Sequence, residues 1–585
     1  MKKILFVISV LSHTILFSQP ATENYPVDSA SVEHPGVPKG EVMRFTFDQS
    51  KIFPGTWREY WIYVPAQYKP DKPACVYVNQ DGIQWKAPTV FDNLINKNEM
   101  PITIGVFITP GRVMADSGSN ALNRFNRSFE YDGLGDGYAK FILNEILPEV
   151  EKKKTSDGRA IRLSKNGNDR AIGGSSSGAI CAFTAAWEHP EEFSRVFSAI
   201  GTYTALRGGD RYPALIRKYE PKPIRVFLQD GSNDLNNNFD DWWKANERME
   251  RTLTFSGYEV NHAWGEGGHN GNMGTAVFPN AMRWLWKDWP KPITKGKSKN
   301  DFLSSLLIPG EDWEMVGEGY QFTEGTGANA AGEMYYQDIP TSKTYKVGLD
   351  GKLITMTVDA KRASGTSFGP DGKRYTAAGG TKQILSYDKN EKETVIADSI
   401  AGNDLVVANN GNIYVTVPDG STTNGKLFLI RPNGEKIEVD KGLKFPNGVA
   451  LSPDQTQLYA TESASHWVWA YKIKNDGTLT YKQRFGWLYV PDTEENAWPD
   501  GIRCDTAGRV YVATRIGIQV LDQLGRVNAI IPIPPSKGQS SNIYFAGADF
   551  NVLYVTAVDK VFRRKLKTRG ANSFDKPIKA GNPRM

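Results

Sequence analysis

The sequence predicts two unlike domains in one chain: an α/β domain with a mostly parallel sheet and flanking helices, then an all-β six-bladed propeller. In the first 290 residues, short apolar strand-like runs alternate with runs of helical spacing. From about residue 319 the helical periodicity nearly vanishes, and short strands recur between turns. A length of 585 residues is too great for a single core and agrees with two large domains.

The N-terminus has the pattern of a secretory signal peptide. Lys2 and Lys3 precede a mostly apolar run over 4–17, and Ser18 is a small residue at which cleavage would fall. Residues 19–40 are polar and contain several prolines, so we expect a leader segment. Because no later run of about 18 apolar residues follows, we expect no membrane span and a secreted or periplasmic location.

Charge and cysteine content exclude some classes of protein. The net charge of +5 is small beside 70 basic and 65 acidic residues, so the composition gives no reason to expect a nucleic-acid partner. Cys75, Cys181 and Cys504 are odd in number and widely spaced. We therefore expect buried free thiols and no disulfide framework.

The α/β domain is expected over 41–289. Its first strands are predicted from alternating or apolar runs, and two helices are predicted from apolar spacing. The strand-like runs cover 42–47, 57–65, 75–78, 102–108, 170–173, 196–201 and 224–228, and the helical runs cover 138–152 and 240–255. The stretch 290–300 is basic and rich in Pro, Gly and Ser, which predicts a linker over 290–318.

The propeller is expected over 319–585. Six strand-like units each carry a tyrosine shortly after a glycine or polar turn, and these tyrosines follow one another at 39 to 52 residues. A β repeat of this period is typical of propeller blades. We expect these tyrosines to lie in the blade cores: Tyr336, Tyr375, Tyr414, Tyr459, Tyr511 and Tyr554.

A G-x-S-x-G pattern marks the candidate nucleophile. Residues 174–178 read Gly-Ser-Ser-Ser-Gly, after a short apolar run and before a helix-like one. Strand, sharp turn and helix are the context in which this pattern forms a nucleophile elbow, and small residues leave room for the close backbone approach. Ser176 is therefore the candidate nucleophile, and the N–H of Ser177 the candidate oxyanion donor.

A serine nucleophile needs a base, and the base needs an orienting carboxylate. His269 lies in a glycine-rich loop downstream, whereas His262 lies nearer a predicted strand and fits a structural role. Asp234 is preferred as the acid because it lies deeper in the loop after a strand, and Asp230 remains the alternative. The order Ser, Asp, His is that of the α/β hydrolases.

These residues resemble the esterase group of α/β hydrolases that contains feruloyl esterases, acetyl xylan esterases of carbohydrate esterase family 1, and enterochelin esterases. Further matching motifs lie at 53–65, 79–82, 127–132 and 231–235. The resemblance implies a second oxyanion donor after 80–82, at Gly82 or Ile83, and no cofactor in this domain. The resemblance does not fix the substrate: we expect a carbohydrate ester or polysaccharide fragment, with a siderophore trilactone as the alternative.

The second half places oxygen-bearing side chains in separate repeats. Glu324, Asn447 and Asp500 each precede a glycine, and Asn403 forms an Asn-Asp pair with the next residue. Singly, each fits an ordinary turn. Oxygen donors that converge on a propeller axis suit a hard cation such as Ca²⁺.

The joint pattern resembles the gluconolactonase and senescence-marker-protein-30 family of six-bladed propellers. The resemblance implies that Glu324, Asn447 and Asp500 hold a divalent metal, with Ca²⁺ the expected ion. It also implies that Asp500 acts as acid/base and that the Asn-Asp pair faces the substrate, with Asn403 contacting metal-bound water or substrate. The implied activity is lactone hydrolysis, and the alternative is a metal-stabilised glycan-binding module.

Overall fold

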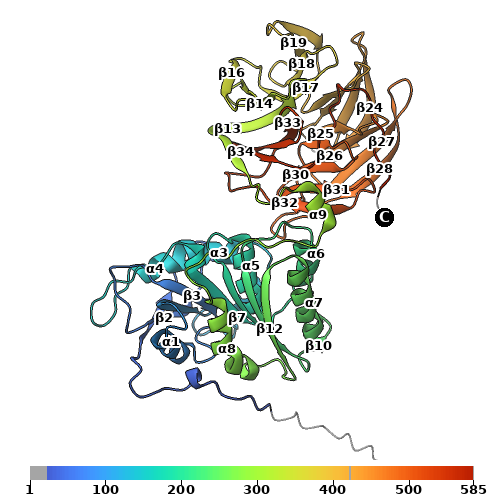
Figure 1. Cartoon of the computed structure of the whole chain (residues 1–585). Helices are drawn as coiled ribbons and strands as arrows, with labels where there is room; N and C mark the ends of the chain where they lie inside the picture. The colour runs from blue at the N-terminus through green and yellow to red at the C-terminus, as the bar shows by residue number, and fades with distance from the viewer. Residues whose placement is uncertain (1–22, 421–422, 584–585) are drawn as a thin grey trace, which may run out of the picture.

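The computed structural model describes residues 23–420 and 423–583, and it shows two bodies joined along one side (Figure 1). The first body is built from helices and strands, and the second from strands with one short helix at the junction. The predicted signal peptide, residues 1–18, lies outside the described residues.

The first body is organised around an eight-stranded sheet in the order β1-β2-β4-β3-β7-β8-β9-β12. The pairs β1–β2 and β2–β4 are antiparallel, and the five pairs from β4 to β12 are parallel. The parallel strands β3, β4, β7, β8 and β9 are largely buried because helices cover both faces of the sheet, whereas the edge strand β12 is partly exposed. The strands are β1 (Glu41–Phe47), β2 (Arg58–Val64), β3 (Cys75–Gln80), β4 (Thr103–Ile108), β7 (Arg170–Ser175), β8 (Arg195–Ala199), β9 (Arg225–Gly231) and β12 (Glu259–Gly265), with short pairs β5 (Arg112–Val113)–β6 (Arg124–Phe125) and β10 (Asn236–Asn237)–β11 (Asp240–Asp241) outside the sheet.

Two apolar clusters, one on each side of this sheet, bind the helices to it. One holds α1 (Ala87–Asn96) and α8 (Asn272–Leu285). The other holds α5 (Ser177–Glu188) and continues into residues of the second body. The remaining helices on that side are α3 (Gly137–Phe141), α4 (Leu147–Glu151), α6 (Tyr212–Ile216) and α7 (Trp242–Phe255), and the short α2 (Arg127–Tyr131) contacts α5.

The second body is propeller-like, but its described strands form five sheets and not the six separate blades expected. The long β13 (Glu314–Ala328) pairs with β34 (Val552–Lys565) near its start and with β14 (Met334–Asp338) near its end. This strand therefore joins the first and last repeats into one six-stranded sheet, β16-β15-β14-β13-β34-β33.

Four four-stranded sheets complete the second body. The six repeat tyrosines lie on the second strand of successive repeats, and all but the partly exposed Tyr375 are buried. The remaining strands are β15 (Lys343–Val347), β16 (Leu353–Thr357), β17 (Ala363–Phe368), β18 (Arg374–Ala378), β19 (Gln383–Tyr387), β20 (Glu393–Ala397), β21 (Leu405–Val407), β22 (Ile413–Val417), β23 (Gly425–Ile430), β24 (Lys436–Leu443), β25 (Pro446–Leu451), β26 (Gln457–Glu462), β27 (Trp467–Ile473), β28 (Leu479–Trp487), β29 (Ile502–Cys504), β30 (Val510–Thr514), β31 (Gly517–Leu521), β32 (Val527–Ile531) and β33 (Asn542–Ala546).

The segment expected to be a linker is partly structured. It contains α9 (Asp301–Leu306), which contacts β32, and the first residues of β13. The amide of Asn300 donates to the carbonyls of Arg217 and Asn528, one in each body, at 2.9 Å. Glu220 accepts two hydrogen bonds from Arg564 at 2.7 and 3.0 Å. These contacts hold the two bodies against each other.

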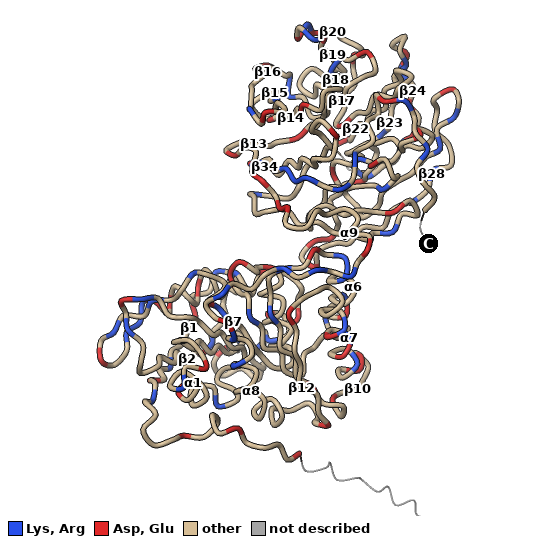
Figure 2. Tube along the Cα trace, in the orientation of Figure 1, with Lys and Arg blue, Asp and Glu red and all other residues tan. Residues whose placement is uncertain are grey.

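The surface chemistry agrees with the composition. Basic and acidic residues alternate over both bodies, and no single sign dominates either one (Figure 2). The three cysteines are buried free thiols, as expected. Among the described residues, no helix is long and apolar enough to cross a membrane.

Candidate functional site

The turn between β7 and α5 holds Ser176 in a strained backbone conformation. Its φ is 59° and its ψ −121°, in a region that residues with a Cβ seldom adopt. A Cβ at Gly174 would lie 2.3 Å from the carbonyl oxygen of Gly178, so the turn requires a glycine there. The strand and helix backbones therefore meet closely, and the serine is presented at the carboxyl end of β7.

Three of the predicted residues form a hydrogen-bonded chain. His269 Nε2 lies 2.8 Å from Ser176 Oγ, and His269 Nδ1 lies 2.5 Å from Asp234 Oδ1. The side chain of Asp234 is fully buried, whereas that of His269 is 21% exposed. The histidine can thus accept a proton from the serine while the carboxylate fixes its ring.

Asp230, the alternative acid, occupies a different position. It is the next-to-last residue of β9, a strand that is buried throughout, and its Oδ1 accepts a hydrogen bond from Gly231 N at 2.7 Å. Burial, and next the neighbouring Asp234 carboxylate, raise the pKa of Asp230 to about 9. Asp230 is therefore a neutral carboxyl group behind Asp234 at neutral pH, and Asp234 pairs with His269.

The oxyanion donors agree only in part with expectation. Ser177 is the first residue of α5, where an amide N–H has no partner within the helix and points toward the turn. The amide of Gly82, in contrast, donates to Ile108 O at 3.1 Å, so the assignment of Gly82 is wrong. The side chain of Ile83 is 39% exposed, and nothing in the structure directs its amide at Ser176.

Asp81 replaces Gly82 as the candidate second donor. Within the described residues its N–H makes only a long contact, 3.4 Å, with Tyr131 Oη. Its carboxylate is bound by Arg127 through two hydrogen bonds of 2.8 Å, and Arg127 also reaches Ser175 O at 3.3 Å. This ion pair fixes the backbone at φ 63° beside the elbow.

A cavity of about 640 Å³ opens at Ser176. Its wall combines apolar groups, a cation and the loop of His269: Asp81, Gln84, Trp85, Arg127, Ser175, Ile200, Asn270, Gly271 and Thr275. His262 lies outside it, stacked on Trp264 at 4.7 Å, which agrees with a structural role. A larger cavity of about 940 Å³ lies between the two bodies and does not include Ser176.

The sequence argument missed Thr202 and Trp242. Thr202 Oγ1 lies 3.2 Å from Ser176 Oγ and accepts from Trp242 Nε1 at 3.2 Å. The ring of Trp242 contacts that of His269 edge-on, with centroids 5.8 Å apart. Thr202 follows β8, the strand beside β7 in the sheet. A polar residue at the carboxyl end of a parallel strand was the sequence signal that could have identified it.

In the second body, Glu324, Asn447 and Asp500 come together. All three are buried, and the carboxyl of Asp500 contacts both Glu324 and Asn447. Burial raises the pKa values of Glu324 and Asp500 well above their usual range, and the nearby Asp404 carboxyl raises both further. Two adjacent buried carboxyl groups need protons or a cation.

The oxygen atoms left without donors test whether a cation fits. Among the described residues, Asp500 Oδ1, Asn447 Oδ1 and Asn403 Oδ1 are buried and accept no hydrogen bond. In the described part of the chain, no three His, Cys, Asp or Glu side chains gather as a metal-binding group. The candidate set in the propeller instead combines two carboxylates, Glu324 and Asp500, with the amides of Asn403 and Asn447. Oxygen-only ligands of this kind suit Ca²⁺ and not a soft metal.

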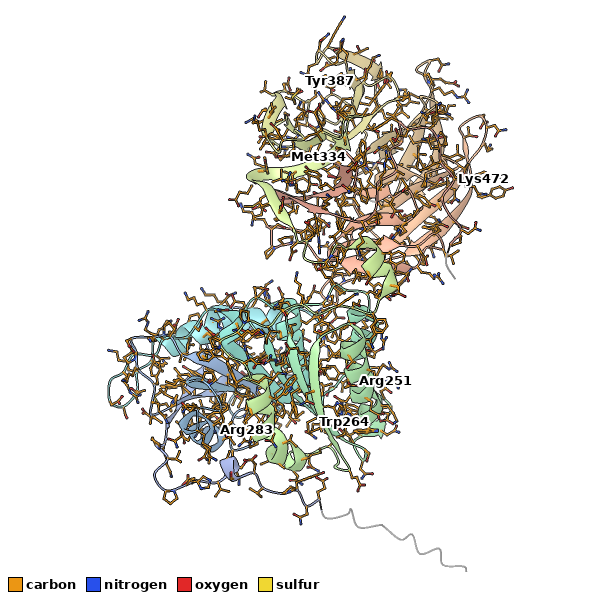
Figure 3. All side chains as sticks on the ribbon, in the orientation of Figure 1. Arg251, Trp264, Arg283, Met334, Tyr387 and Lys472 are labelled. Carbon is orange, nitrogen blue, oxygen red and sulfur yellow. The ribbon has the colours of Figure 1, made fainter. Side chains whose placement is uncertain are left out.

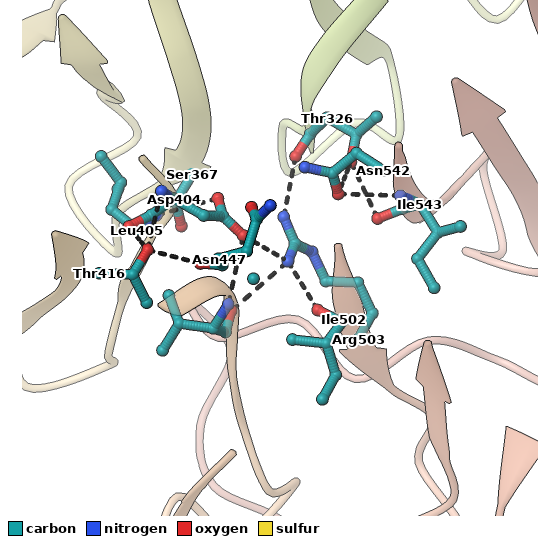
Figure 4. Close-up of polar contacts among 12 residues, drawn as sticks. Thr326, Ser367, Asp404, Leu405, Thr416, Asn447, Ile502, Arg503, Asn542 and Ile543 are labelled. Carbon is teal, nitrogen blue, oxygen red and sulfur yellow. Dashed lines mark hydrogen bonds and ion pairs between the residues drawn. The ribbon is translucent and has the colours of Figure 1, made fainter. Parts of the chain in front are cut away.

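Asp404 does not face a substrate, which corrects the implied role of the Asn-Asp pair. It is fully buried, and its Oδ2 accepts from Arg503 Nη1 at 3.2 Å and from Val449 N at 3.3 Å (Figure 4). Arg503 also donates to Thr326 O at 3.1 Å, so its guanidinium links three repeats near the axis (Figure 4). Only Asn403 of the pair keeps a free oxygen.

Replacing each candidate acid by asparagine should affect catalysis differently. We expect Asp234→Asn to lower kcat/KM about 10⁴-fold, because an amide beside His269 Nδ1 favours the wrong tautomer. Asp230→Asn should stay within about tenfold of wild type, since an amide resembles the neutral carboxyl. Steady-state kinetics on a p-nitrophenyl ester compare them, and equal losses would contradict the assignment.

The raised pKa of Asp230 makes stability depend on pH. Above the unfolded value near 3.8 and up to about 9, the folded state binds a proton that the unfolded state releases. The wild-type free energy of unfolding should therefore fall between pH 4 and pH 9 relative to that of Asp230→Asn. Urea unfolding of both proteins at pH 5 and pH 8 checks this, and a constant difference would contradict it.

Comparison with known proteins agrees with both halves of this geometry. Residues 54–288 match the family described as putative esterase, and residues 317–559 match the SMP-30/gluconolactonase/LRE-like region. A gluconolactonase of Zymomonas mobilis subsp. mobilis is 29% identical over 231 residues, which span 36% of this chain and 64%, less than two thirds, of that relative.

Two solved esterases are more distant. The enterobactin esterase of Shigella flexneri shares 17% identity, covering 43% of this chain and 61% of its own, with a TM-score of 0.33. A ferulic acid esterase shares 18% identity, and the match covers 43% of this chain and 99% of the esterase chain, with a TM-score of 0.32. The two family matches show that the N-terminal half resembles the esterases and the C-terminal half the gluconolactonase/SMP-30 family, and together they support a two-domain hydrolase.

Proposed function

We propose that this protein is a secreted hydrolase with two active centres. The N-terminal half is a serine carbohydrate esterase of the α/β-hydrolase type that removes feruloyl or acetyl groups from plant polysaccharide such as xylan. The C-terminal half is a metal-dependent lactonase. The observation that carries the proposal is the chain of hydrogen bonds from Ser176 through His269 to Asp234 on a strained turn.

The esterase reaction follows from these contacts. His269 Nε2 takes the proton of Ser176 Oγ as the oxygen attacks the ester carbonyl carbon, and the Ser177 and Asp81 N–H groups face the developing oxyanion. The C–O bond to the alcohol breaks, and His269 returns its proton to that oxygen. Water then attacks the acyl-enzyme with the same histidine as base, which releases the acid and restores Ser176.

The residues of the pocket wall indicate which acyl group the cavity can accept. Trp85 and Ile200 line a cavity of about 640 Å³ beside Ser176, which offers an apolar surface and room for a cinnamoyl group. Arg127 is a cation in the same wall, and this favours the second candidate, a siderophore trilactone with anionic catechol oxygens.

In the propeller half, Glu324, Asn447 and Asp500 would hold a divalent cation, with Ca²⁺ the best match to the donor set. When bound, the ion would polarise the carbonyl of a lactone. Asp500 would exchange the proton with water, and Asn403 Oδ1 would accept a hydrogen bond from water or substrate. A metal-stabilised glycan-binding module is the alternative for this half.

Substrate hydrolysis by three proteins tests the proposal. Wild type, Ser176→Ala and Asp500→Asn are assayed on methyl ferulate, acetylated xylan fragments, a catechol trilactone and glucono-lactone. Ester hydrolysis should fall by about 10⁵-fold or more in Ser176→Ala alone. Lactone hydrolysis should fall in Asp500→Asn alone. Full ester turnover by Ser176→Ala would exclude the esterase site, and absence of lactone turnover in wild type would leave a binding module.

Metal content is a separate prediction. Wild-type protein should bind close to one Ca²⁺ per chain in equilibrium dialysis, and Asp500→Asn should weaken this binding at least tenfold, because it removes one of two charged ligands. Asp338→Asn is the matched control, since Asp338 is equally buried in the propeller but bonds to the backbone at Phe322 N. Equal affinity in both variants would refute the ligand set.

A further inference from the structure

The loop that carries His269 is held from two sides. On one side, backbone bonds tie it to the loop of Asp234: Ser232 N donates to Gly265 O at 2.8 Å, and Asn233 N to Gly267 O at 3.2 Å. On the other side lies the described part of the leader segment, residues 23–40, which is distant from the loop in sequence.

Glu23 is the contact between the leader segment and this loop. Its Oε1 accepts hydrogen bonds from Gly268 N at 2.9 Å and from Asn270 Nδ2 at 2.8 Å. Its Oε2 lies 3.4 Å from Asn272 Nδ2. One carboxylate therefore binds the residue before His269, the residue after it, and the start of α8. The hydrogen bond from Gly268 lowers the pKa of Glu23, so the group is charged in the working range.

The leader segment is itself anchored to the first body. Asp28 pairs with Arg283 on α8 at 2.8 Å, and Arg283 is labelled on that helix in Figure 3. The amide of Asn93 on α1 donates to Ala30 O at 2.8 Å and Val32 O at 2.9 Å. These bonds fix the leader segment five or more residues after Glu23 to the first body.

The loop needs such support because of its composition. Glycines stand at 265, 267, 268 and 271, so the backbone around His269 has few intrinsic restraints. A Cβ at Gly267 would lie 2.6 Å from the hydroxyl of Tyr25, so the leader segment also fills the space over the loop. The distance from His269 Nε2 to Ser176 Oγ depends on this backbone, and small errors in such a distance slow catalysis strongly.

We propose that Glu23 is a positioning residue for the catalytic histidine. It holds His269 at hydrogen-bonding distance from Ser176 by fixing both of its neighbours in the chain. This role rests on the proposed esterase function, and Glu23 itself touches neither the substrate nor the reacting atoms.

Four full-length variants test the role on a p-nitrophenyl ester. Glu23→Ala should lower kcat about 10- to 100-fold with KM changed less than threefold, because charged hydrogen bonds of this kind are lost. Glu23→Gln keeps an acceptor for Gly268 N–H and should recover most of kcat. Glu33→Ala is the matched control: Glu33 lies in the same segment, paired with Lys39 in solvent, and should behave as wild type. Ser176→Ala tests whether the measured ester hydrolysis depends on the proposed nucleophile.

The outcomes separate the two proposals. Loss of activity in Ser176→Ala with normal kcat in Glu23→Ala overturns the positioning role and leaves the esterase intact. Full activity in Ser176→Ala overturns the esterase assignment instead. A rise in KM at normal kcat would assign Glu23 to the pocket wall through Asn270 and contradict the role. Equal thermal midpoints for all four proteins are expected, and a large drop confined to Glu23→Ala with no rescue by Glu23→Gln would also contradict it.

Discussion

The strained turn at Ser176 is the constraint on which the N-terminal half depends. Gly174 leaves room for the backbone of Gly178 where strand and helix meet, and in this turn Ser176, a residue with a Cβ, holds φ at 59°. The acid follows β9 and the histidine follows β12, and the strands β7, β8, β9 and β12 are neighbours in one parallel run. Their carboxyl ends meet at one edge, so loops far apart in sequence deliver their side chains to the same place.

The two candidate centres lie apart. Ser176 precedes the first residue of α5, whereas Trp187 and Glu188 at its other end line the cavity between the bodies. A helix of this length spans roughly 18 Å. The cavity also includes Arg515, whose guanidinium lies 5.5 Å from the ring of Trp498, two residues before Asp500. This interdomain cavity lies at the end of α5 remote from Ser176, whereas the esterase pocket opens at Ser176 itself.

Much of the first site could be predicted from the sequence, because its signals are local. The elbow pattern, a strand followed by Asp234 and a glycine-rich loop around His269 each show in a few residues. The Gly82 donor was wrong because the hydrogen bond of its amide to Ile108 depends on the pairing of β4 beside β3, which no local pattern encodes. Glu23 escaped notice for the same reason, since its partners lie about 245 residues away.

In the second half, five of the six repeat tyrosines are buried as predicted, because packing residues that recur at a regular period are visible in the sequence, whereas Tyr375 is partly exposed. The number of separate sheets was not predicted correctly, because β13 starts inside the expected linker and pairs with β34 near its start and with β14 near its end. The resemblance implied that Asp404 faces the substrate, but its carboxylate is buried and accepts a hydrogen bond from Arg503. Such long-range charge pairing is decided by topology, whereas Glu324, Asn447 and Asp500 converge because they lie in or just before the first strands of different repeats.

Covalent labelling tests the central claim most directly. The full-length protein is treated with a fluorophosphonate, which reacts with serines that a neighbouring base activates, and the adduct is located by peptide mass spectrometry. The account predicts one adduct per chain, on Ser176, with labelling slowed at least 100-fold in His269→Ala and unchanged in Asp500→Asn. An adduct on another serine, or equal labelling of His269→Ala, would contradict it.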